Sequence, residues 1–498
     1  MIAAVALIGL FLADAAPLSS APPAIPPSFF ATHRERFLAK LPAGSIAVFH
    51  AAAETTVETS PDPYRQSSDF WYLTGLSEPE SVCVLIPASG GSAARFLLFV
   101  RPGDFAAEQW TGRRAGVEGA KKDFGAEAYP IAELWNRLTA LAASGQGQGQ
   151  AQALFYESGG DEAFGRKLLE TWNAGNANAL APRPAADASP LLAELRLVKD
   201  AAEIDLLRTA SRISAEAHRA AMAEVAPGRG EWDLKAAMVG TCLARGAARM
   251  AYPPIVGSGA SSVLLHYVND DARLADGAFI VNDTACEYGM YTSDVTRSYP
   301  VSGRFSAEQR KIYEIVLAAQ KVGFAAVKPG AAFHEVHDAT VRVIVDGLLS
   351  LGILTGERAE ILQTRAYQKF YPHGSSHWVG LNVHDAGSYQ YPPGVDRLAK
   401  YGLAQTKLVP GMVLTVEPGI YIAAGATSGT AEGPARDPRW NDLGVRIEDV
   451  VLVTPSGMEC LSCDAPREIA DVEKAIAEGR AKGKGKAKAK GSHAAESR

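Results

Sequence analysis

The chain has 498 residues, more than one hydrophobic core accommodates, and this length predicts about two to four domains. Hydrophobic residues make up 47% of it and charged residues 21%, which is the composition of a globular protein rather than a disordered or fibrous one. A formal net charge of −6 argues against a nucleic-acid-binding protein. No internal run approaches the roughly 18 apolar residues that span a bilayer, so stable membrane insertion is not expected.

The N-terminus resembles a secretory signal. An apolar run ends at the A-x-A-like sequence Ala13-Asp14-Ala15, and a stretch rich in Pro, Ser and Ala follows up to Pro27. The positively charged start of such a signal is missing, because the first basic residue is Arg34. The pattern favours a secreted or periplasmic protein over a cytoplasmic one, and we set residues 1–29 apart as a leader and linker.

Residues 30–185 are predicted to form an α/β domain, because predicted strands alternate with helical patterns. The predicted elements are a helix over 34–41 and strands over 45–50, 81–86 and 94–100. The proline-containing stretch 181–190 is the predicted interdomain linker.

Residues 190–478 are predicted to form a second domain of the α+β class, because helices and strands are grouped there rather than strictly alternating. The predicted helices run from Asp200 to about Pro227 and over 232–245, 306–329 and 333–351. The predicted strands lie at 412–417 and 445–453. In the tail, 479–498, Lys alternates with Gly and Ala without an apolar face, which predicts disorder.

The segment Phe279–Pro300 has β-rich ends and a central reversal, which predicts a hairpin. If the turn centres on Tyr288 and Gly289, Asp283 lies directly opposite Asp294, with Cβ atoms about 5 Å apart. Two carboxylates in that position repel each other unless a cation lies between them. A two-residue register offset or a solvated turn is the alternative.

Two further carboxylates, Glu417 and Glu448, are also candidates for binding a cation. Glu417 ends the apolar strand predicted over 412–417, so its carboxylate is expected to be buried and to need a cation or a proton. In the strand predicted over 445–453, Arg446 and Glu448 point to one face. By themselves, these two residues could form no more than an ion pair.

Three of the ten histidines fall within twelve residues, namely His373, His377 and His384. A single buried histidine is usually structural, whereas three grouped among glycines favour metal ligands or proton-transfer groups. His266 is a weaker candidate of the same kind.

The combined set of Asp283, Asp294, His377, Glu417 and Glu448 contains four carboxylates, one imidazole and no thiolate. Four negative charges match two divalent cations, and oxygen-rich ligands suit Mn²⁺, Co²⁺ or Zn²⁺ better than soft metals. Two such ions about 3.5–4 Å apart can share a water molecule, lower its pKa and hold a carbonyl for attack. Asp294 and Glu448 are the expected bridging ligands.

The order of these ligands and the motifs around them resemble the pita-bread metallopeptidases. The motifs are Asn282-Asp283-Thr284, 293–297, His373-Gly374-x-x-His377, 416–419 and 446–449. Upstream, Tyr64–Gly75 and Glu108–Arg114 resemble the N-terminal domain of aminopeptidase P. The resemblance covers about residues 30–478, and it implies a C-terminal pita-bread domain preceded by an α/β domain.

The resemblance also implies roles for the metal ligands. Asp283 binds one metal ion, His377 and Glu417 bind the other, and Asp294 and Glu448 bridge both. Glu417 also takes a proton from the attacking water. Mn²⁺ is the expected metal, with Co²⁺ or Zn²⁺ as alternatives.

Other residues match positions around the substrate. His266 and His384 match histidines that hold substrate or stabilise the tetrahedral intermediate, and His373 matches a proton-relay histidine. Three more residues match positions near the substrate pocket or the metals: Trp110, Tyr421 and Arg446. The chain departs from the family pattern at Ala285, where Gly is usual, and at Ser375, in the H-G-L-x-H motif, so details of the pocket are open.

The implied function is that of a dinuclear exopeptidase that releases the N-terminal residue from peptides with proline second, by attack of a water shared by the metals. Prolidase, which hydrolyses X-Pro dipeptides, is the alternative, and a non-catalytic pita-bread peptide-binding protein is a third possibility. Proline-containing peptides and further copies of the chain are the expected partners.

The five cysteines do not predict a disulfide framework, because their number is odd and they lack metal-finger spacing. Cys460 and Cys463 form a lone C-x-x-C that could be a redox pair, a local disulfide or a chance spacing. Without a second pair, chance spacing is the prediction.

Overall fold

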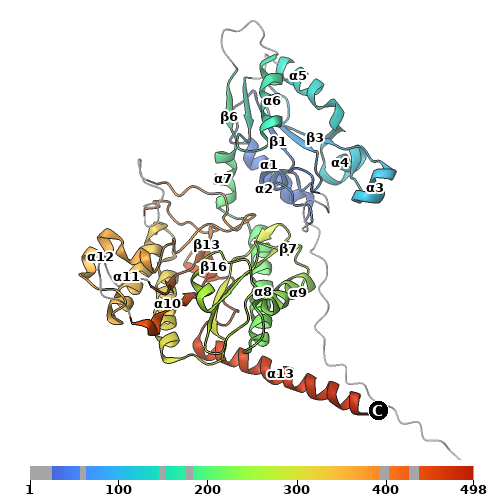
Figure 1. Cartoon of the computed structure of the whole chain (residues 1–498). Coiled ribbons are helices and arrows are strands. Elements are labelled where there is room, and N and C mark those ends of the chain that lie inside the picture. The colour runs from blue at the N-terminus through green and yellow to red at the C-terminus, as the bar shows by residue number, and fades with distance from the viewer. Residues whose placement is uncertain are drawn as a thin grey trace, which may run out of the picture.

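The computed structural model describes residues 25–55, 63–144, 152–174, 183–391, 403–425 and 437–496, with the backbone alone for 483–496. The chain forms two bodies, an N-terminal domain at the top of Figure 1 and a larger C-terminal domain below it. Among the described helices, none combines the length and apolar character needed to traverse a bilayer. Residues 1–24 of the predicted leader lie outside the described residues.

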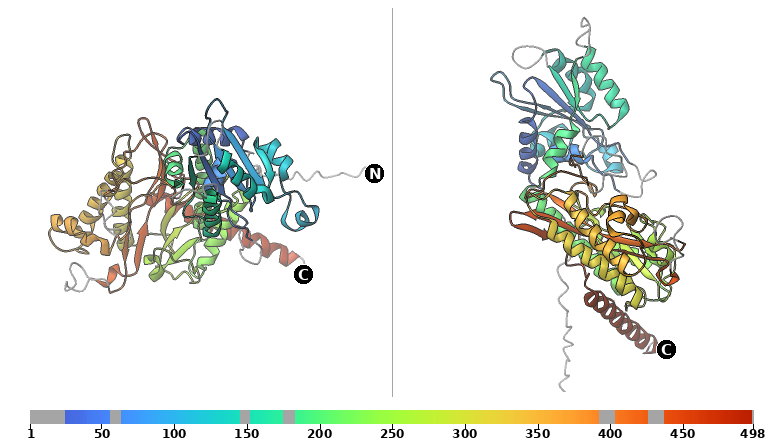
Figure 2. Two further views of the ribbon diagram at one scale, coloured as in Figure 1. Left: turned by 90° about the horizontal axis from the view of Figure 1, so that it is seen from above. Right: turned by 90° about the vertical axis from the view of Figure 1, so that its left-hand side faces the viewer.

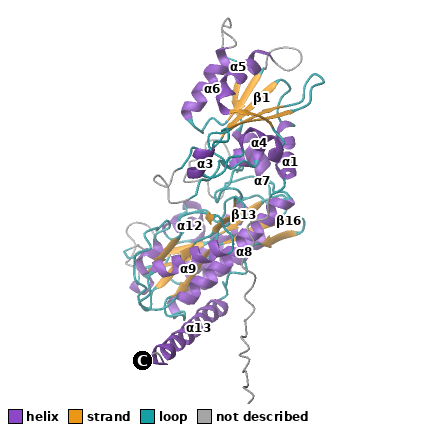
Figure 3. Cartoon of the chain, turned by 90° about the vertical axis from the view of Figure 1, so that its right-hand side faces the viewer, coloured by secondary structure: helices purple, strands orange, loops and turns teal. Residues whose placement is uncertain are grey.

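The N-terminal domain contains a mixed six-stranded sheet with strand order β4-β3-β2-β1-β5-β6. Its strands are β1 (Ser45–His50), β2 (Val82–Ile86), β3 (Arg95–Val100), β4 (Glu127–Pro130), β5 (Ala153–Tyr156) and β6 (Ala185–Asp187). Its helices are α1 (Pro27–Leu38), α2 (Ser68–Thr74), α3 (Phe105–Thr111), α4 (Gly116–Phe124), α5 (Leu134–Ser144) and α6 (Glu162–Ala174). Figure 3 shows these helices packed around the sheet, so the predicted α/β class is confirmed.

The central strand β1 is buried on both faces because it carries apolar side chains at successive positions, which point alternately to the two faces. Ile46 and Val48 pack with α5 and α6 in a core that belongs to this domain alone. Ala47 and Phe49 face the opposite side and join the large core that continues into the C-terminal domain.

The predicted domain boundaries need two corrections. Helix α1 begins at Pro27, so the end of the stretch assigned to the leader belongs to the domain; proline is well tolerated at the first helical position. The predicted linker contains β6, which pairs in parallel with β5 at the edge of the sheet. The connection between the domains is therefore α7 (Ser189–Leu197) rather than a loop.

The C-terminal domain contains two groups of helices and strands, one from the green segments and one from the yellow-to-red segments of Figure 2. Its helices are α8 (Ala201–Glu224), α9 (Glu231–Ala244), α10 (Ala307–Ala326), α11 (His334–Ser350), α12 (Arg358–Thr364) and α13 (Ile469–Glu496). Its longer strands are β8 (Ile255–Ser258), β9 (Phe279–Asp283), β12 (Thr296–Pro300), β13 (Val413–Val416), β14 (Gly419–Ile422), β15 (Leu443–Arg446), β16 (Asp449–Thr454) and β17 (Gly457–Cys460). The shorter strands are β7 (Arg249–Met250), β10 (Cys286–Tyr288) and β11 (Tyr291–Thr292).

In one group, α8 and α9 pack together beside the sheet β12-β9-β8, and in the other α10 and α11 pack together beside β13-β16-β17. The predicted capping box that starts α8 is present, because Asp200 and Glu203 satisfy each other's backbone N–H groups. This grouping of helices and strands confirms the predicted α+β class.

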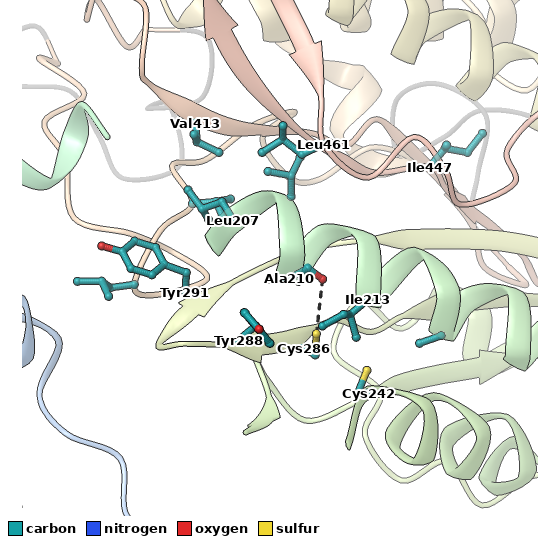
Figure 4. Close-up of a cluster of buried hydrophobic side chains, with 14 of the residues drawn as sticks. Leu207, Ala210, Ile213, Cys242, Cys286, Tyr288, Tyr291, Val413, Ile447 and Leu461 are labelled. Carbon is teal, nitrogen blue, oxygen red and sulfur yellow. Dashed lines mark hydrogen bonds between the residues drawn. The ribbon is translucent and has the colours of Figure 1, made fainter. Parts of the chain in front are cut away.

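The core beneath the β10–β11 hairpin is drawn in Figure 4. Leu207, Ala210 and Ile213 of α8 point toward Cys286 and Tyr291 of the hairpin. The Cys286 Sγ lies 3.5 Å from the Ala210 carbonyl oxygen. The hairpin that carries the aspartates therefore rests on a rigid helix.

Helix α13 corrects the prediction of a disordered tail, because it extends to Glu496 (Figure 1). Its first turns are anchored by Val472 and Ile476, which are completely buried. Adding residues to an existing helix is easier than nucleating one, and Lys and Ala are strong helix formers. The Lys-rich composition thus continues a helix that the core has already started.

A second correction concerns the C-x-x-C pair, which forms a disulfide between Cys460 and Cys463. Strand β17 ends at Cys460 and the chain turns there, so the two Cα atoms lie 5.6 Å apart. This separation falls within the usual range for a disulfide. The other three cysteines, Cys83, Cys242 and Cys286, are free and buried.

The two domains are joined by buried polar contacts as well as by the shared core. Nε2 of His33 in α1 lies 3.2 Å from Oδ2 of Asp200, which precedes α8. Arg65 donates a 2.6 Å hydrogen bond to Glu287 in the hairpin. Arg196 of α7 contacts Asp69 in the N-terminal domain and Asp385 in the C-terminal domain.

Candidate metal centre and active site

The predicted hairpin exists, but its register differs from the expected one. Tyr288 pairs with Tyr291, and Asp283 pairs with Thr296. The turn therefore centres on Gly289 and Met290, whose φ angles of 56° and 71° are both positive, as a tight two-residue hairpin turn requires. The prediction that Asp283 and Asp294 are directly opposed is wrong, and the two-residue offset is correct.

The offset still leaves both aspartates on one face, as diagonal neighbours. Both are at least nine-tenths buried. The Tyr252 hydroxyl lies 2.6 Å from Asp283 Oδ1 and 2.7 Å from Asp294 Oδ1. Arg446 Nη2 donates to the other oxygen of Asp283. The sequence analysis missed Tyr252, because nothing local in the sequence signals a residue that is 31 and 42 positions from its partners.

The segment around His377 runs alongside β13, which fixes His377 relative to Glu417. The Thr415 N–H donates to the His377 carbonyl, and the Glu417 N–H donates to the Ser375 carbonyl, each over 2.9 Å. His377 Nε2 lies 3.2 Å from Asp294 Oδ2 and 3.6 Å from Glu417 Oε1. The His377 Nδ1–H donates to the Trp378 carbonyl at 3.1 Å, so Nε2 faces the carboxylates and can bind a cation when it carries no proton.

Glu448 completes the cluster from a break between strands. The predicted strand over 445–453 is two strands, because β15 pairs with β14 while β16 pairs with β13. Glu448 lies where the chain passes from one sheet to the other, and Thr296 Oγ1 donates a 2.6 Å hydrogen bond to it. One ligand atom from each of Asp294, His377 and Glu448 lies within 4.8 Å of the others.

The cluster carries excess negative charge. Burial raises the pKa of Glu448 well above its usual value, and the neighbouring Asp294 adds to this. Burial likewise raises the pKa of Glu417 to about 7, although His377 opposes the shift. Burial is the largest single influence on His377 and works against a charge there, but the hydrogen bond to Asp294 and the negative charges of Glu417 and Asp294 together outweigh it and raise the pKa of His377 to about 9.

All three pKa values are raised, so each of these groups binds a proton more tightly than usual. A buried group of carboxylates without enough positive charge is costly, and protons or metal ions reduce the cost. The predicted five residues thus converge on one point with hard oxygen donors and one imidazole. This donor set fits divalent cations.

A cavity of about 600 Å³ opens onto the cluster. Of the predicted residues, those that line it are Asp283, Asp294, His377, Glu417, Glu448, His266, His373, His384 and Arg446. His266 and His384 are exposed at the cavity, and the His384 ring packs edge-on against His377, with 4.3 Å between ring centroids. The structure therefore brings together nearly all of the predicted site.

Tyr421 and His373 form a hydrogen-bonded chain beside the cluster. Arg446 donates to the Tyr421 hydroxyl at 2.8 Å, and that hydroxyl lies 2.8 Å from His373 Nε2. The His373 Nδ1–H donates to the Gly374 carbonyl at 2.7 Å, which leaves Nε2 to accept from Tyr421. Burial, followed by the charge of Arg446, lowers the pKa of His373 to about 3, so this imidazole is neutral at neutral pH.

Two cavity histidines were missed, His334 and His337, both on α11. The sequence predicted the helix without assigning these side chains to the site. Their i, i+3 spacing at the start of that helix was the available signal. His337 Nδ1 lies 2.9 Å from the Ser375 hydroxyl, so the departure from the family motif at Ser375 gives this histidine a partner.

Trp110 is the exception among the predicted site residues. It lies on α3 of the N-terminal domain, is 90% exposed and does not line the cavity. Within one chain, the expectation that Trp110 lies near the substrate pocket is not met. Helix α3 buries none of its residues, which leaves the tryptophan on the surface.

Comparison with known proteins agrees with this arrangement. Residues 205–455 match the family model for metallopeptidase family M24, and residues 30–148 match the N-terminal domain of aminopeptidase P. The Xaa-Pro aminopeptidase of Escherichia coli is 36% identical over 91% of this chain and 98% of its own length. The corresponding enzyme of Haemophilus influenzae is 35% identical over 90% of this chain and 97% of its own.

Solved structures give the same result. Aminopeptidase PepP of Pseudomonas aeruginosa matches with a TM-score of 0.82 and 37% identity, over 92% of this chain and 99% of that one. Aminopeptidase P of E. coli with the inhibitor Pro-Leu matches with the same TM-score and 35% identity, over 92% of this chain and 99% of that one. The chain therefore belongs to metallopeptidase family M24 and, within it, to the aminopeptidase P (Xaa-Pro aminopeptidase) group of hydrolases.

Proposed function

We propose that this chain is a dinuclear metal-dependent exopeptidase that releases the N-terminal residue from peptides with proline in second position. The observation that carries the proposal is the cluster of Asp283, Asp294, His377, Glu417 and Glu448 at a cavity of about 600 Å³. Arg446 offsets only part of the negative charge of the four carboxylates. The remaining charge would suit two divalent cations, with Asp294 and Glu448 as the bridging carboxylates. When bound, the cations supply a strong nucleophile at neutral pH and polarise the scissile carbonyl.

Glu417 is the proton acceptor of the proposed reaction. Its carboxylate lies at the edge of the cluster, 3.4 Å from His373 Nδ1 and 3.6 Å from His377 Nε2. From this position beside the cavity, the carboxylate can take a proton from water and return it to the leaving amine.

The neighbouring side chains orient the substrate. Burial and the charge of Arg446 keep His373 neutral, and its hydrogen bonds to Gly374 and Tyr421 hold its ring in one orientation. His266 and His384 stand at the cavity, where their rings can contact the peptide carbonyl or the prolyl ring. A preformed cavity suits an X-Pro amide, because proline lacks an N–H and has a restricted backbone. The similarity to relatives named Xaa-Pro aminopeptidase supports this substrate class.

The test compares three peptides of matched sequence with Mn²⁺-loaded protein: an X-Pro dipeptide, an X-Pro-Y tripeptide and an X-Ala-Y tripeptide. We expect cleavage of X-Pro-Y at the X-Pro bond and little cleavage of X-Ala-Y. Turnover confined to the dipeptide would assign the chain to the prolidases. Stoichiometric metal binding without cleavage of any peptide would leave a peptide-binding protein.

We further propose Mn²⁺ as the metal, with Co²⁺ and Zn²⁺ as alternatives. Four carboxylates and one imidazole form a hard, oxygen-rich set, and no thiolate lies in it. Loading the metal-free protein with each ion in turn and measuring kcat for the X-Pro-Y peptide tests this choice. Higher turnover with Zn²⁺ than with Mn²⁺ would overturn it.

A further inference from the structure

The disulfide between Cys460 and Cys463 lies close to Asp449, the residue that follows the predicted ligand Glu448, and the proposed reaction makes no use of it. Unlike the three free cysteines, which are buried, both of its residues are partly exposed. Cys463 lines a surface cavity of about 380 Å³. A small thiol, or the exposed cysteine of another protein, can therefore reach its sulfur.

Arg467 is the charged residue beside the sulfur of Cys463, in a cavity whose lining carries both signs of charge. Arg219, Arg467 and Lys474 are its basic residues, and its acidic residues are Asp464, Glu468, Asp471 and Glu478. The Arg467 guanidinium contacts Cys463 Sγ, and its Nη1 lies 4.0 Å from Cys460 Sγ. Positive charge beside a sulfur stabilises a thiolate, so the site favours both the approach of an attacking thiolate and the departure of the one displaced.

The four-residue loop closed by the disulfide also holds Asp449, which follows the predicted metal ligand Glu448 in the chain. Ser462, between the two cysteines, donates a 2.6 Å hydrogen bond to Asp449 Oδ1 and accepts one from the Val450 N–H at 3.0 Å. Arg467 Nη1 lies 3.3 Å from Asp449 Oδ2. Ser462 within the loop and Arg467 just beyond it therefore hold the two carboxylate oxygens of Asp449.

Asp449 in turn positions Arg297, and both residues are completely buried. Arg297 Nη2 donates a 2.6 Å hydrogen bond to Asp449 Oδ1, while Nη1 donates to the carbonyl oxygens of Glu448 at 2.6 Å and Thr296 at 2.9 Å. Thr296 then donates through its hydroxyl to Glu448 Oε2. A continuous set of hydrogen bonds thus leads from the disulfide loop to the carboxylate of Glu448.

We propose that Cys460–Cys463 is a thiol–disulfide exchange site that a dithiol reduces at Cys463, and that its reduction weakens divalent-metal binding at Glu448 by loosening Asp449 and Arg297. In the first step, a thiolate of the dithiol attacks Cys463 Sγ, the disulfide bond breaks, and Cys460 leaves as a thiolate that takes a proton from water. In the second, the other thiol of the reductant displaces Cys463 beside Arg467. The protein disulfide gains two electrons and two protons, and the dithiol is oxidised to a disulfide.

The first measurement counts thiols and is independent of peptidase activity. The folded protein is alkylated before and after treatment with dithiothreitol, and the labelled peptides are identified by mass spectrometry. We expect no label on Cys460 or Cys463 before reduction and complete label on both afterwards, while Cys83, Cys242 and Cys286 stay unlabelled. Label before reduction, or resistance of the folded protein to the reductant, would overturn the exchange site.

The second measurement determines the Kd for Mn²⁺ by calorimetry in the oxidised, reduced and reoxidised protein. We expect reduction to raise the Kd by about tenfold, the lower end of the effect of losing an outer partner of a metal ligand, and reoxidation to restore it. The double variant Cys460→Ser/Cys463→Ser should show the reduced value under all conditions, and Cys83→Ala should behave as wild type. An unchanged Kd in the reduced wild-type protein would overturn the coupling, whether or not the double variant folds.

Discussion

Two buried carboxylate clusters in this chain have opposite charge balance. At the domain interface, Asp69 and Asp385 are paired with Arg196 and Lys199. Although burial opposes it, the charges of Arg196 and Lys199 lower the pKa of Asp385. In the candidate metal centre, four carboxylates share one arginine, and burial raises the pKa of Glu448 well above its usual value.

The contrast separates carboxylates that hold the structure together from carboxylates that bind an external cation. Where protein cations match the acids, the acids stay ionised and the cluster fastens the domains. Where acids are in excess, the fold needs protons or metal ions. Glu157 is an intermediate case at the same interface, because burial and the adjacent Asp69 raise its pKa to about 8. Among the described residues, Glu157 is a carboxyl group at this interface that lacks an ion-pair partner, and a bound proton neutralises it.

The largest expected effect comes from Asp294→Asn. This change removes a predicted bridging ligand without changing the shape of the side chain. We expect kcat/KM to fall by at least about 10⁴-fold, or about 5 kcal/mol, because both metal positions are affected. Peptidase assays and elemental analysis check it. Full metal content in the variant would contradict the bridging role.

The matching change at the other cluster is Asp385→Asn. It leaves Arg196 and Lys199 without their shared partner in a buried site, so we expect the free energy of unfolding to fall by about 3–5 kcal/mol. Metal content should stay at the wild-type level. Denaturant titration together with elemental analysis checks both statements, and a stable variant that has lost its metal would reverse the comparison.

Addition of Mn²⁺ should stabilise the folded protein by binding at the candidate metal centre and not at the carboxylate cluster of the domain interface. At a free concentration of about 100 times Kd, a ligand that binds only the folded state adds about 2.7 kcal/mol, which corresponds to roughly 3–5 °C in Tm for a protein of this size. We expect this shift in wild type and in Asp385→Asn, and its absence in Asp294→Asn. Equal shifts in all three proteins would show that the metal binds elsewhere.

The smallest effect is a pH dependence at Glu157. Its folded pKa of about 8 lies above its ordinary value of 4.5, so between these values the folded state keeps a proton that the unfolded state has lost. The contribution of Glu157 to the free energy of unfolding is therefore highest below about pH 4.5. It falls as the pH rises from there and levels off above about pH 8. Glu157→Gln should therefore unfold about 2–4 °C higher than wild type at pH 8.5 and flatten the pH profile of Tm. The exposed Glu162→Gln is the control, and a profile parallel to wild type in Glu157→Gln would reject the assignment.

The sequence was sufficient for the composition of the metal cluster. Asp283 and Asp294 lie eleven residues apart in a hairpin, and Glu417 follows a strand with a clear apolar pattern. In contrast, the register of the hairpin depended on whether Met290 adopts a positive φ, which few non-glycine residues do. The local sequence does not determine the backbone conformation of Met290, so tertiary packing determines the register of the hairpin.

Residues that act through distant contacts could not be predicted. Tyr252 reaches both aspartates from the bend between β7 and β8, and Asp449 holds Arg297, which donates to the Glu448 carbonyl. The disulfide depends on a turn at the end of β17 that the spacing of Cys460 and Cys463 permits without requiring. In each case, local sequence defines the element and the packing of separate elements defines the contact.

The central claim is that the excess of carboxylates at Asp294 and Glu448 exists to bind two metal ions. Anomalous diffraction from crystals loaded with Mn²⁺ tests it most directly. The account predicts two peaks about 3.5–4 Å apart, with Asp294 and Glu448 each in contact with both. A single peak, or two peaks that share neither carboxylate, would contradict it.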